Sequence, residues 1–424
     1  MTDTTNSKRN YYIVFLILLT FFVISFLTNI IGPLVPDIIK GFNLSLTLVA
    51  VLPFAFFIAY GLVSIPAGIM VEKYKEKKVM AVAFIVSFIG ALMLALFPNY
   101  LTAVVSLFLI GSGMAMLQVV INPLLRTSGG EENYAFNSVL AQLIFGLASF
   151  ISPLVYSYLV LDLKSSESHD GLLNFFYSLV PADLTWISLY WLFAFVSIIM
   201  IIVILLSRFP KVVLSEDEKA PALKVHLDLL KNPVVVLFFI AIFCYVGTEQ
   251  GVANWISQFL LEYHQYNPQT TGAKEVAYFW GLMTAGGLLG LVLLKIMDSR
   301  KVLIGFTLLA IISLTVGLFS NGPVALIAFP LVGFFASVMY PIIFSLALNS
   351  LKEHHGAFSG ILLTGVIGGA VIPLIIGWMG DHWGLRSGMF FLYLTLGYIL
   401  SVGFWAKPII SNKTIQIGHK EKLS

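Results

Sequence analysis

Twelve long apolar runs divide the chain into segments of similar length. Each run has 18 or more residues and at most one charged side chain. A bilayer hydrocarbon core about 30 Å thick is spanned by about 20 consecutive apolar residues in an α-helix. The pattern therefore predicts an all-α polytopic membrane protein with twelve transmembrane helices, over residues 11–32, 46–71, 79–97, 101–125, 137–160, 186–207, 233–259, 277–294, 302–320, 323–347, 357–380 and 387–405.

The composition agrees with a chain whose surface faces lipid. Apolar residues make up 59% of the 424 positions and charged residues only 11%, against about 25% charged residues in a soluble globular protein. This excludes a water-soluble enzyme. The single cysteine, Cys244, excludes a disulfide framework and a thiolate metal cluster within the chain. The net charge of +3, without a basic run interleaved with aromatic residues, gives no indication of a nucleic-acid partner.

Lysine and arginine residues alternate between dense and sparse loops. With the N-terminus inside, the segments that face the cytoplasm hold 20 of the 24 Lys and Arg residues, and the outer segments hold only Lys40, Lys164, Lys274 and Arg386. Positive residues are retained on the cytoplasmic side of a membrane. We therefore expect both termini to be cytoplasmic.

The chain also repeats itself at an offset of about 222 residues. Leu109-Ile110-Gly111 recurs as Leu331-Val332-Gly333, and Phe136-Asn137-Ser138 recurs as Phe358-Ser359-Gly360. Two parallel six-helix repeats, with a substrate site between them near the membrane midplane, are the architecture of the major facilitator superfamily. The predicted organisation is an N-terminal half at 1–207, a cytoplasmic linker at 208–232 with a short interfacial helix, a C-terminal half at 233–406 and a tail at 407–424.

The loop after the second predicted helix resembles a signature of that superfamily, in which a glycine precedes an acid and a basic cluster. The positions are Gly68, Glu72, Lys73, Lys77 and Lys78. The acid suits the N-terminal end of a neighbouring helix, and the cations suit a gating loop that joins the two halves when the protein faces outward. The alternative is an ordinary cytoplasmic loop, which the positive-inside rule alone makes basic.

Glu249 is the one acid near the middle of a predicted span, because the other 20 Asp and Glu residues fall in loops or at helix ends. A charged side chain in the bilayer costs about 2.5 kcal/mol or more, so it usually marks a pathway. On a helical wheel Glu249, Gln250 and Asn254 share one broad face, which we expect to line a cavity. The alternative is a protonated Glu249 that only hydrogen-bonds to the helix at 11–32 or the helix at 357–380.

Polar side chains in the other predicted helices favour a sugar site. An amide both donates and accepts, so it pairs with a sugar hydroxyl whichever way the hydroxyl rotates. Trp255 and Trp280 offer flat apolar faces for a pyranose ring, and the repeat offset places Tyr340 opposite Gln118. The alternative is that these amides only join helices. The candidate substrate-binding residues are Asn29, Gln118, Asn122, Gln142, Gln250, Asn254 and Tyr340.

Other motifs give no indication of a cofactor or a metal. Gly286-Gly287 and Gly368-Gly369 do not follow a strand or precede Lys-Ser/Thr, as a phosphate loop requires. They suit close helix packing instead. The histidines in loops, such as His354 and His355, lack further ligands at metal-binding spacing.

Four motifs occur together and in order along the chain. With them the chain resembles the fucose-galactose-glucose:proton symporter family of the major facilitator superfamily. The resemblance implies uptake of a hexose or a related sugar across a bacterial inner membrane. The motifs are Met114 to Pro123 with Gln118 and Asn122, Phe136-Asn137-Ser138 with Leu140-Ala141-Gln142, Phe243 to Glu249, and Tyr340-Pro341 to Ser345.

The chain departs from this family at two acids. The family's fucose permease has an Asp in the first helix and a Glu in the fourth, both tied to proton coupling and sugar binding. Gly32 and Gln118 stand at the matching positions and cannot titrate. Glu249 is then the only strong candidate for cation coupling within the predicted spans.

The leading hypothesis is a secondary transporter that imports a hexose by proton symport, with two halves that rock around a central site. Alternatives within transport are a sodium-coupled porter, an uncoupled facilitator and, with less support, a drug exporter. An enzyme is not expected, because the spans lack a nucleophile with a base. We expect a monomer in the lipid bilayer that binds a small-molecule sugar and uses H⁺, or alternatively Na⁺, as its coupling ion.

Overall fold

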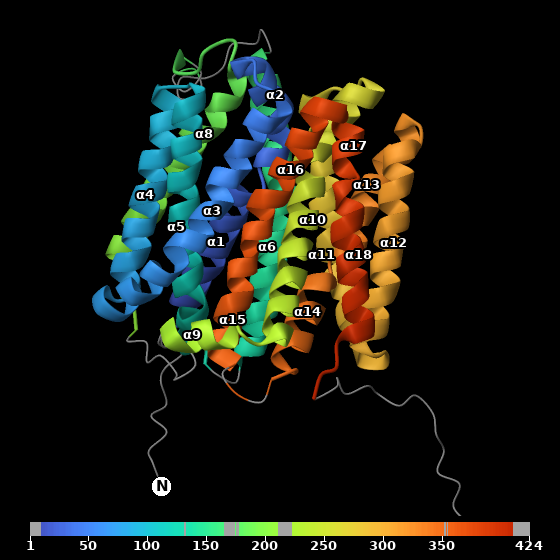
Figure 1. The fold of residues 1–424 in the computed structure, drawn as a ribbon. Coiled ribbons are helices and arrows are strands. Elements are labelled where there is room, and N and C mark those ends of the chain that lie inside the picture. Colours follow the sequence, from blue (N-terminus) through green and yellow to red (C-terminus); the bar gives the residue numbers. More distant parts are fainter. Residues whose placement is uncertain are drawn as a thin grey trace, which may run out of the picture.

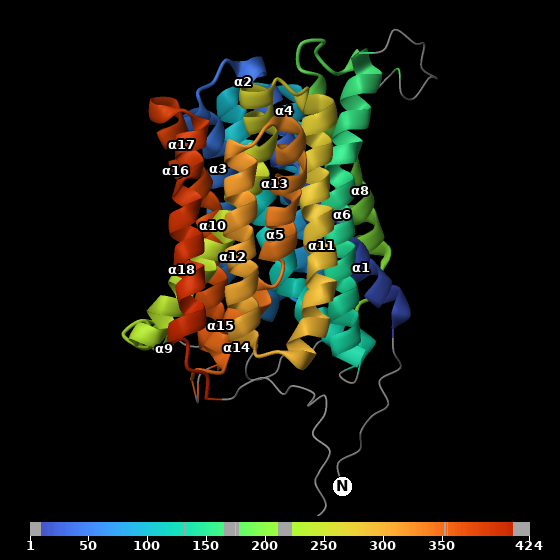
Figure 2. The same ribbon diagram turned by 90° about the vertical axis from the view of Figure 1, so that its right-hand side faces the viewer.

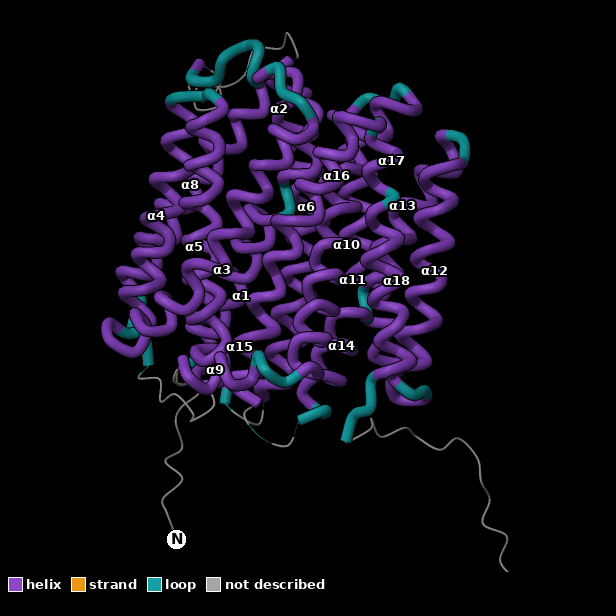
Figure 3. The backbone as a smooth tube through the Cα atoms, in the orientation of Figure 1, coloured by secondary structure: helices purple, strands orange, loops and turns teal. Residues whose placement is uncertain are grey.

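The computed structural model of the chain describes residues 10–130, 133–164, 174, 178–210, 223–351, 353 and 355–409. The tail beyond residue 409 and residues 211–222 of the predicted linker lie outside these ranges. Helices and no strands occur in the described part (Figure 3). The α-helices are α1 (Tyr11–Thr28), α2 (Ile31–Phe42), α3 (Leu46–Tyr74), α4 (Glu76–Leu96), α5 (Tyr100–Gly129), α6 (Tyr134–Lys164), α8 (Ser188–Leu206), α9 (Leu223–Leu229), α10 (Pro233–His264), α11 (Ala273–Ile296), α12 (Ser299–Phe319), α13 (Gly322–Ala336), α14 (Met339–Leu348), α15 (His355–Thr364), α16 (Gly368–Trp383), α17 (Leu385–Met389) and α18 (Phe391–Trp405).

The prediction of twelve spans is confirmed, because twelve helices of the described part are long and apolar enough to cross a membrane. Several spans are built from two consecutive helices. The first, Tyr11–Phe42, joins α1 and α2, and the tenth, Gly322–Leu348, joins α13 and α14. The predicted end of the first span at residue 32 is wrong, since α2 continues for ten more residues. Its start tolerates Pro33, because the first turn of a helix has no partner for the N–H group that proline lacks, whereas Pro36 lies inside the helix.

Polar residues between the apolar runs fix where the helices begin. The side chain of Ser45 accepts a hydrogen bond from the backbone N–H of Leu48 at 3.2 Å. Such caps satisfy N–H groups that the first turn leaves without a partner. The same kind of cap begins α5, α10, α12 and α13, from the side chains of Asn99, Asn232, Asp298 and Asn321.

The repeat in the sequence is also a repeat in the packing. Gly111 of α5 lies against the backbone of Phe56 in α3, so closely that a Cβ atom would clash there. Gly333 of α13 lies in the same way against the carbonyl of Phe279 in α11. The offset of about 222 therefore relates two equivalent helix contacts, one in each half.

The helices stand side by side as one bundle with two ends (Figure 1). We call the end where α1 begins and α18 ends the termini end, and the opposite end, where α2 ends and α3 begins, the far end. The halves meet along two seams and where α2 contacts α10. One seam joins α3 to α16, and the other joins α6 to α11 (Figure 2).

Candidate functional site

Glu249 lies in a cluster of hydrogen-bonding side chains near the middle of α10. The amide of Gln250 donates to Glu249 Oε1 at 3.2 Å, and Tyr245, one turn earlier, also hydrogen-bonds to Glu249. The ring of Tyr340, in the first turn of α14, lies 5.7 Å from the ring of Tyr245. The structure thus brings together three of the predicted site residues, namely Glu249, Gln250 and Tyr340.

The chemistry of this cluster suits a carboxylate that gains and loses a proton. Glu249 is half-buried, while Gln250 and Tyr245 are buried. A bound arginine or lysine would hold the carboxylate in its ionised form. Neutral donors such as Gln250 and Tyr245 stabilise the ionised form but still allow the carboxylate to take up a proton. The cluster also presents phenol and amide groups that match sugar hydroxyls.

The broad face of α10 points toward the N-terminal half. The Cγ atom of Gln250 lies close to Gly369 of α16, where Phe57 of α3 also packs. One turn further, the Cα atom of Asn254 lies beside Gly32 of α2. Both amides therefore lie where the two halves face each other.

Gly32 explains one departure from the family pattern in physical terms. A Cβ atom at Gly32 would clash with the carbonyl oxygen of Ala253. In this conformation α2 and α10 touch backbone to backbone, so an aspartate side chain does not fit at this position. The loss of the acid therefore coincides with a close contact between the halves.

Three buried polar atoms of α10 and α11 have no hydrogen-bond partner. They are Asn254 Nδ2, Gln258 Oε1 and Trp280 Nε1. Most buried polar groups are paired, because an unpaired one costs about 1–3 kcal/mol. These atoms are therefore available to a ligand. Gln258 lies one turn beyond Asn254 on the same helix, and the sequence places it near Glu249 without counting it among the candidate substrate-binding residues.

The two tryptophans expected to cover a sugar ring differ in their surroundings. Trp255 is fully buried, and its indole N–H donates to the carbonyl of Pro373 at 3.3 Å within the C-terminal half. It serves the contact between α10 and α16 and is not available as a sugar platform. Trp280, with its free indole N–H, keeps that potential.

The amides of the N-terminal half fall into two groups. Asn29 Nδ2 donates to Ser149 Oγ at 2.9 Å and so joins the end of α1 to α6. Gln118 and Asn122 lie one turn apart on α5, the first half-buried and the second exposed, and Gln142 on α6 is exposed. Asn29 thus has the helix-joining contact of the alternative interpretation. The other three side chains are accessible, and no described hydrogen bond joins them to Glu249.

The predicted gating loop is tied to its own half. Lys77 Nζ donates to the backbone carbonyls of Leu205 and Ser207 at 2.8 Å each, at the end of α8. A cation at a helix C-terminus satisfies free carbonyls and complements the helix dipole. Glu72, Lys73 and Lys78 are exposed, and a Cβ atom at Gly68 would find no atom within 4 Å. In this conformation Lys77 therefore does not link the halves.

Two acids that the sequence placed outside the spans lie within them. Asp37 is part of α2 and accepts hydrogen bonds from Tyr156 and Gln269. Glu275, in the first turn of α11, is 5% exposed, and its Oε2 atom has no partner. The predicted spans missed both residues because each predicted span was ended where polar residues or prolines interrupt the apolar run. The spans Tyr11–Phe42 and Pro268–Ile296 extend past those positions.

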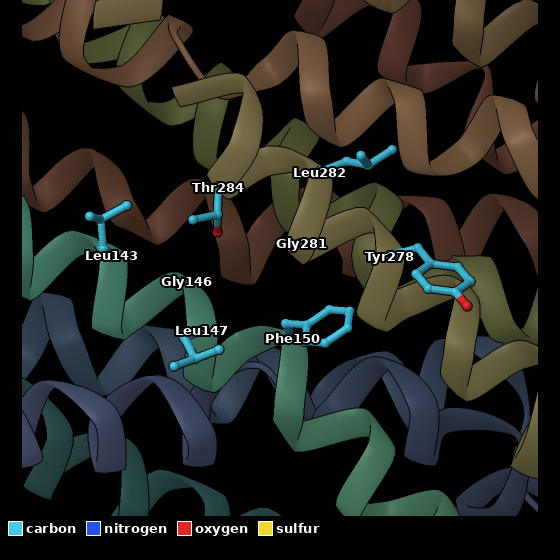
Figure 4. Close-up of a pocket in the computed structure, with 8 residues that line it drawn as sticks. All are labelled: Leu143, Gly146, Leu147, Phe150, Tyr278, Gly281, Leu282 and Thr284. Atoms are coloured by element: carbon cyan, nitrogen blue, oxygen red, sulfur yellow. The ribbon is translucent and has the colours of Figure 1, made fainter. Parts of the chain in front are cut away.

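A lateral groove of about 470 Å³ lies between α6 and α11 (Figure 4). It contains none of the predicted site residues. The side chains of Leu147 and Tyr278 are about half exposed, and the Thr284 hydroxyl is bonded to the carbonyl of Trp280. The groove thus offers few polar partners for a sugar. It is part of the α6–α11 seam and not of the candidate site. Its lining is Leu143, Gly146, Leu147, Phe150, Tyr278, Gly281, Leu282 and Thr284.

The sequence matches the model of the Major Facilitator Superfamily over residues 17–373. The chain belongs to this superfamily. It is 31% identical over 406 residues to a glucose/galactose transporter of Brucella abortus, with 95% of this chain and 96% of that protein covered. It is 26% identical over 394 residues to the L-fucose-proton symporter of Escherichia coli, with 88% of each chain covered. The resemblance to the fucose-galactose-glucose:proton symporter family is therefore confirmed.

Solved structures support the same fold. The crystal structure of the E. coli fucose:proton symporter matches with a TM-score of 0.66 at 23% identity, over 94% of this chain and all of that one. An inward-facing bacterial homologue of the human lysosomal transporter Spinster matches with a TM-score of 0.78 at 14% identity, over 95% and 98%. The prediction of a major facilitator fold with two six-helix halves is thus confirmed.

Proposed function

We propose that the protein imports a hexose or a related sugar by proton symport, with alternating access between its two halves. The observation that carries the proposal is the Glu249 cluster. It places one carboxyl group of α10 among Tyr245, Gln250 and Tyr340, in a chain whose relatives are named as glucose/galactose transporters and a fucose-proton symporter. A catalytic role is not part of this proposal.

The sugar would lie between the halves, with Glu249 as both proton carrier and hydroxyl acceptor. The free polar atoms of Asn254 and Trp280 would pair with the ring from one side. From the other half, the accessible amides of Gln118, Asn122 and Gln142 would complete the site. Asn29 would support it through its bond to α6, and Gln250 and Tyr340 through their contacts in the Glu249 cluster.

A proton is the coupling ion we favour over sodium. Sodium requires several oxygen ligands, whereas the Gln250 group that reaches Glu249 is an amide donor. Proton coupling, in contrast, needs only one carboxylate that takes up a proton on one side of the membrane and releases it on the other.

We further propose a bacterial inner membrane as the location, with both termini in the cytoplasm and a monomer as the working unit. The even number of spans in the described part agrees with termini on one side. The charge distribution makes that side the cytoplasmic one, since 20 of the 24 Lys and Arg residues fall in its loops. Under this topology the termini end faces the cytoplasm and the far end faces outward.

The test uses purified protein in liposomes with labelled glucose, galactose and fucose, and an inward proton gradient, a sodium gradient or neither. We expect accumulation of one sugar under the proton gradient. Glu249→Gln should abolish accumulation and keep exchange of sugar for sugar. The matched control is Glu262→Gln, an exposed acid near the end of the same helix, which should accumulate sugar normally.

Each other outcome contradicts a defined part of the proposal. Accumulation that follows sodium at constant pH would replace the proton by sodium. Equilibration without accumulation in the native protein would make it a facilitator. Full accumulation by Glu249→Gln would remove Glu249 from the coupling step, and no flux of any sugar would overturn the substrate class.

A further inference from the structure

Asp37 of α2 is bonded to both halves at the far end. Its two carboxylate oxygens each accept from the side-chain amide of Gln269 at 3.0 Å. Gln269 belongs to the short helix Pro268–Gly272 that precedes α11. Tyr156 of α6 donates its hydroxyl to Asp37 Oδ2 at 2.6 Å. We call this group of three residues the Asp37 clasp.

Asp381, near the end of α16, makes a second bridge, in which the carboxylate belongs to the C-terminal half and the donors to the N-terminal half. Its Oδ1 atom accepts from the backbone N–H of Leu46 at 2.8 Å, and its Oδ2 atom accepts from the N–H of Thr47 at 2.8 Å. The Thr47 hydroxyl donates to the same oxygen. These N–H groups belong to the first turn of α3, which has no partner of its own for them. We call this group the Asp381 clasp.

The two clasps lie at one end of the bundle and on separate seams. α3 begins and α16 ends at the far end, as α2 does (Figure 1). The Asp381 clasp joins the α3–α16 seam, and the Asp37 clasp joins the side of α6 and α11. Both clasps are places where hydrogen bonds cross between the halves.

Backbone contacts reinforce the closure at this end. At the far end, a Cβ atom at Gly377 of α16 would lie 2.6 Å from the carbonyl oxygen of Leu46, and nearer the middle of the bundle Gly32 of α2 touches the carbonyl of Ala253. The structure is therefore closed at the far end, which is the outward side of the proposed topology.

We propose that Asp37 and Asp381 are gate residues of the transport cycle, and that their carboxylates hold the far end closed until the halves rock apart. Each carboxylate belongs to one half and accepts hydrogen bonds from donor groups of the other half. Hydrogen bonds to a charged acceptor are stronger than neutral ones. Opening the far end breaks these hydrogen bonds, so the clasps set the balance between the closed and the open state of the far end.

The test measures the far-end distance directly, without sugar. Spin labels at Leu101→Cys in α5 and Val324→Cys in α13, both at far-end helix starts, report the separation of the halves in nanodiscs, with Cys244 replaced by Ala. Asp37→Asn and Asp381→Asn should each lower the ratio of closed to open molecules by about tenfold. The double variant should be mostly open.

The matched control is Asp298→Asn at the termini end. Partial burial raises the pKa of Asp298, but hydrogen bonds from Arg300 and its charge outweigh this effect and lower it. Asp298 is therefore a bonded acid whose partner lies in the same half, at 3.3 Å. Its substitution should leave the far-end distance unchanged. A shift equal to that of the clasp variants would show a general loss of packing and overturn the proposal.

Gln269→Ala provides a second variant in case an aspartate variant fails to fold, because it truncates only a side chain in a short helix at the end of the bundle. It should open the far end in the same direction as Asp37→Asn. Distances like those of the native protein in Gln269→Ala and in the double variant would overturn the proposal. Because the labels report without sugar, this outcome is separate from any failure of hexose transport.

Discussion

The far end and the termini end of the bundle are held by different kinds of contact. At the far end, carboxylates from each half accept hydrogen bonds from the other, and glycines let the backbones touch. At the termini end, Lys77 and Arg300 are bonded within their own halves. The difference indicates that the far end carries carboxylate contacts between the halves that a transport cycle must break and remake, whereas these two cations of the termini end do not join the halves.

The largest effect is expected at the close contact between α2 and α10. Gly32→Asp restores the acid of the fucose permease, but its side chain would clash with the Ala253 carbonyl. Wedging a side chain into a packed contact costs about 1–3 kcal/mol, so uptake should fall on the order of 100-fold. We would measure initial uptake and the far-end label distance, which should lengthen.

The control for this variant is Gly287→Ala on α11, where an added methyl group meets no atom within 4 Å. Its uptake should stay near that of the native protein. Restored or enhanced coupling in Gly32→Asp, without a longer distance, would show that the contact between α2 and α10 has room for the aspartate side chain, contrary to the clash with Ala253.

A smaller effect is expected from the free polar atoms beside that contact. Asn254→Leu removes an amide nitrogen that has no partner in the protein. If that atom binds sugar, its loss should raise KM about tenfold with little change in stability, as expected for one hydrogen bond.

Asn29→Leu sharpens the comparison of these amides. Asn29 is already bonded to Ser149, so its removal should lower thermal stability and leave KM less affected. The two variants would be compared in KM for uptake and in melting temperature. Equal effects on KM would contradict the division into free and bonded amides.

The smallest effect is expected at the termini end. Lys77→Met removes the cation that caps the end of α8 through the Leu205 and Ser207 carbonyls. The cap is worth about 0.3–1 kcal/mol, so the melting temperature should fall by about 2 °C. The far-end distance should not change. Lys78→Met, on an exposed neighbour, is the matched control and should melt as the native protein does.

Much of the fold was predictable because a bilayer imposes a simple rule on the sequence. Twelve apolar runs predict the twelve spans, and Glu249 stands out because a charge inside an apolar run is costly. The end of the first span was missed, since Pro33, Asp37 and Lys40 interrupt its apolar pattern. A proline in a first helical turn and polar residues facing other helices are compatible with a span, but apolar counting does not recognise them.

The sequence by itself determined the class of the protein, its repeat and the single acid near the middle of a span. These follow from periodicity and from the cost of charge in lipid, which are local properties of the chain. Only the tertiary structure decided which polar residues are already paired. Asp37 and Gln269 are 232 residues apart, and Asn29 is bonded whereas Asn254 is free. Such pairings depend on how two separately folded halves meet at their seams, and the spacing of residues along one chain does not specify that meeting.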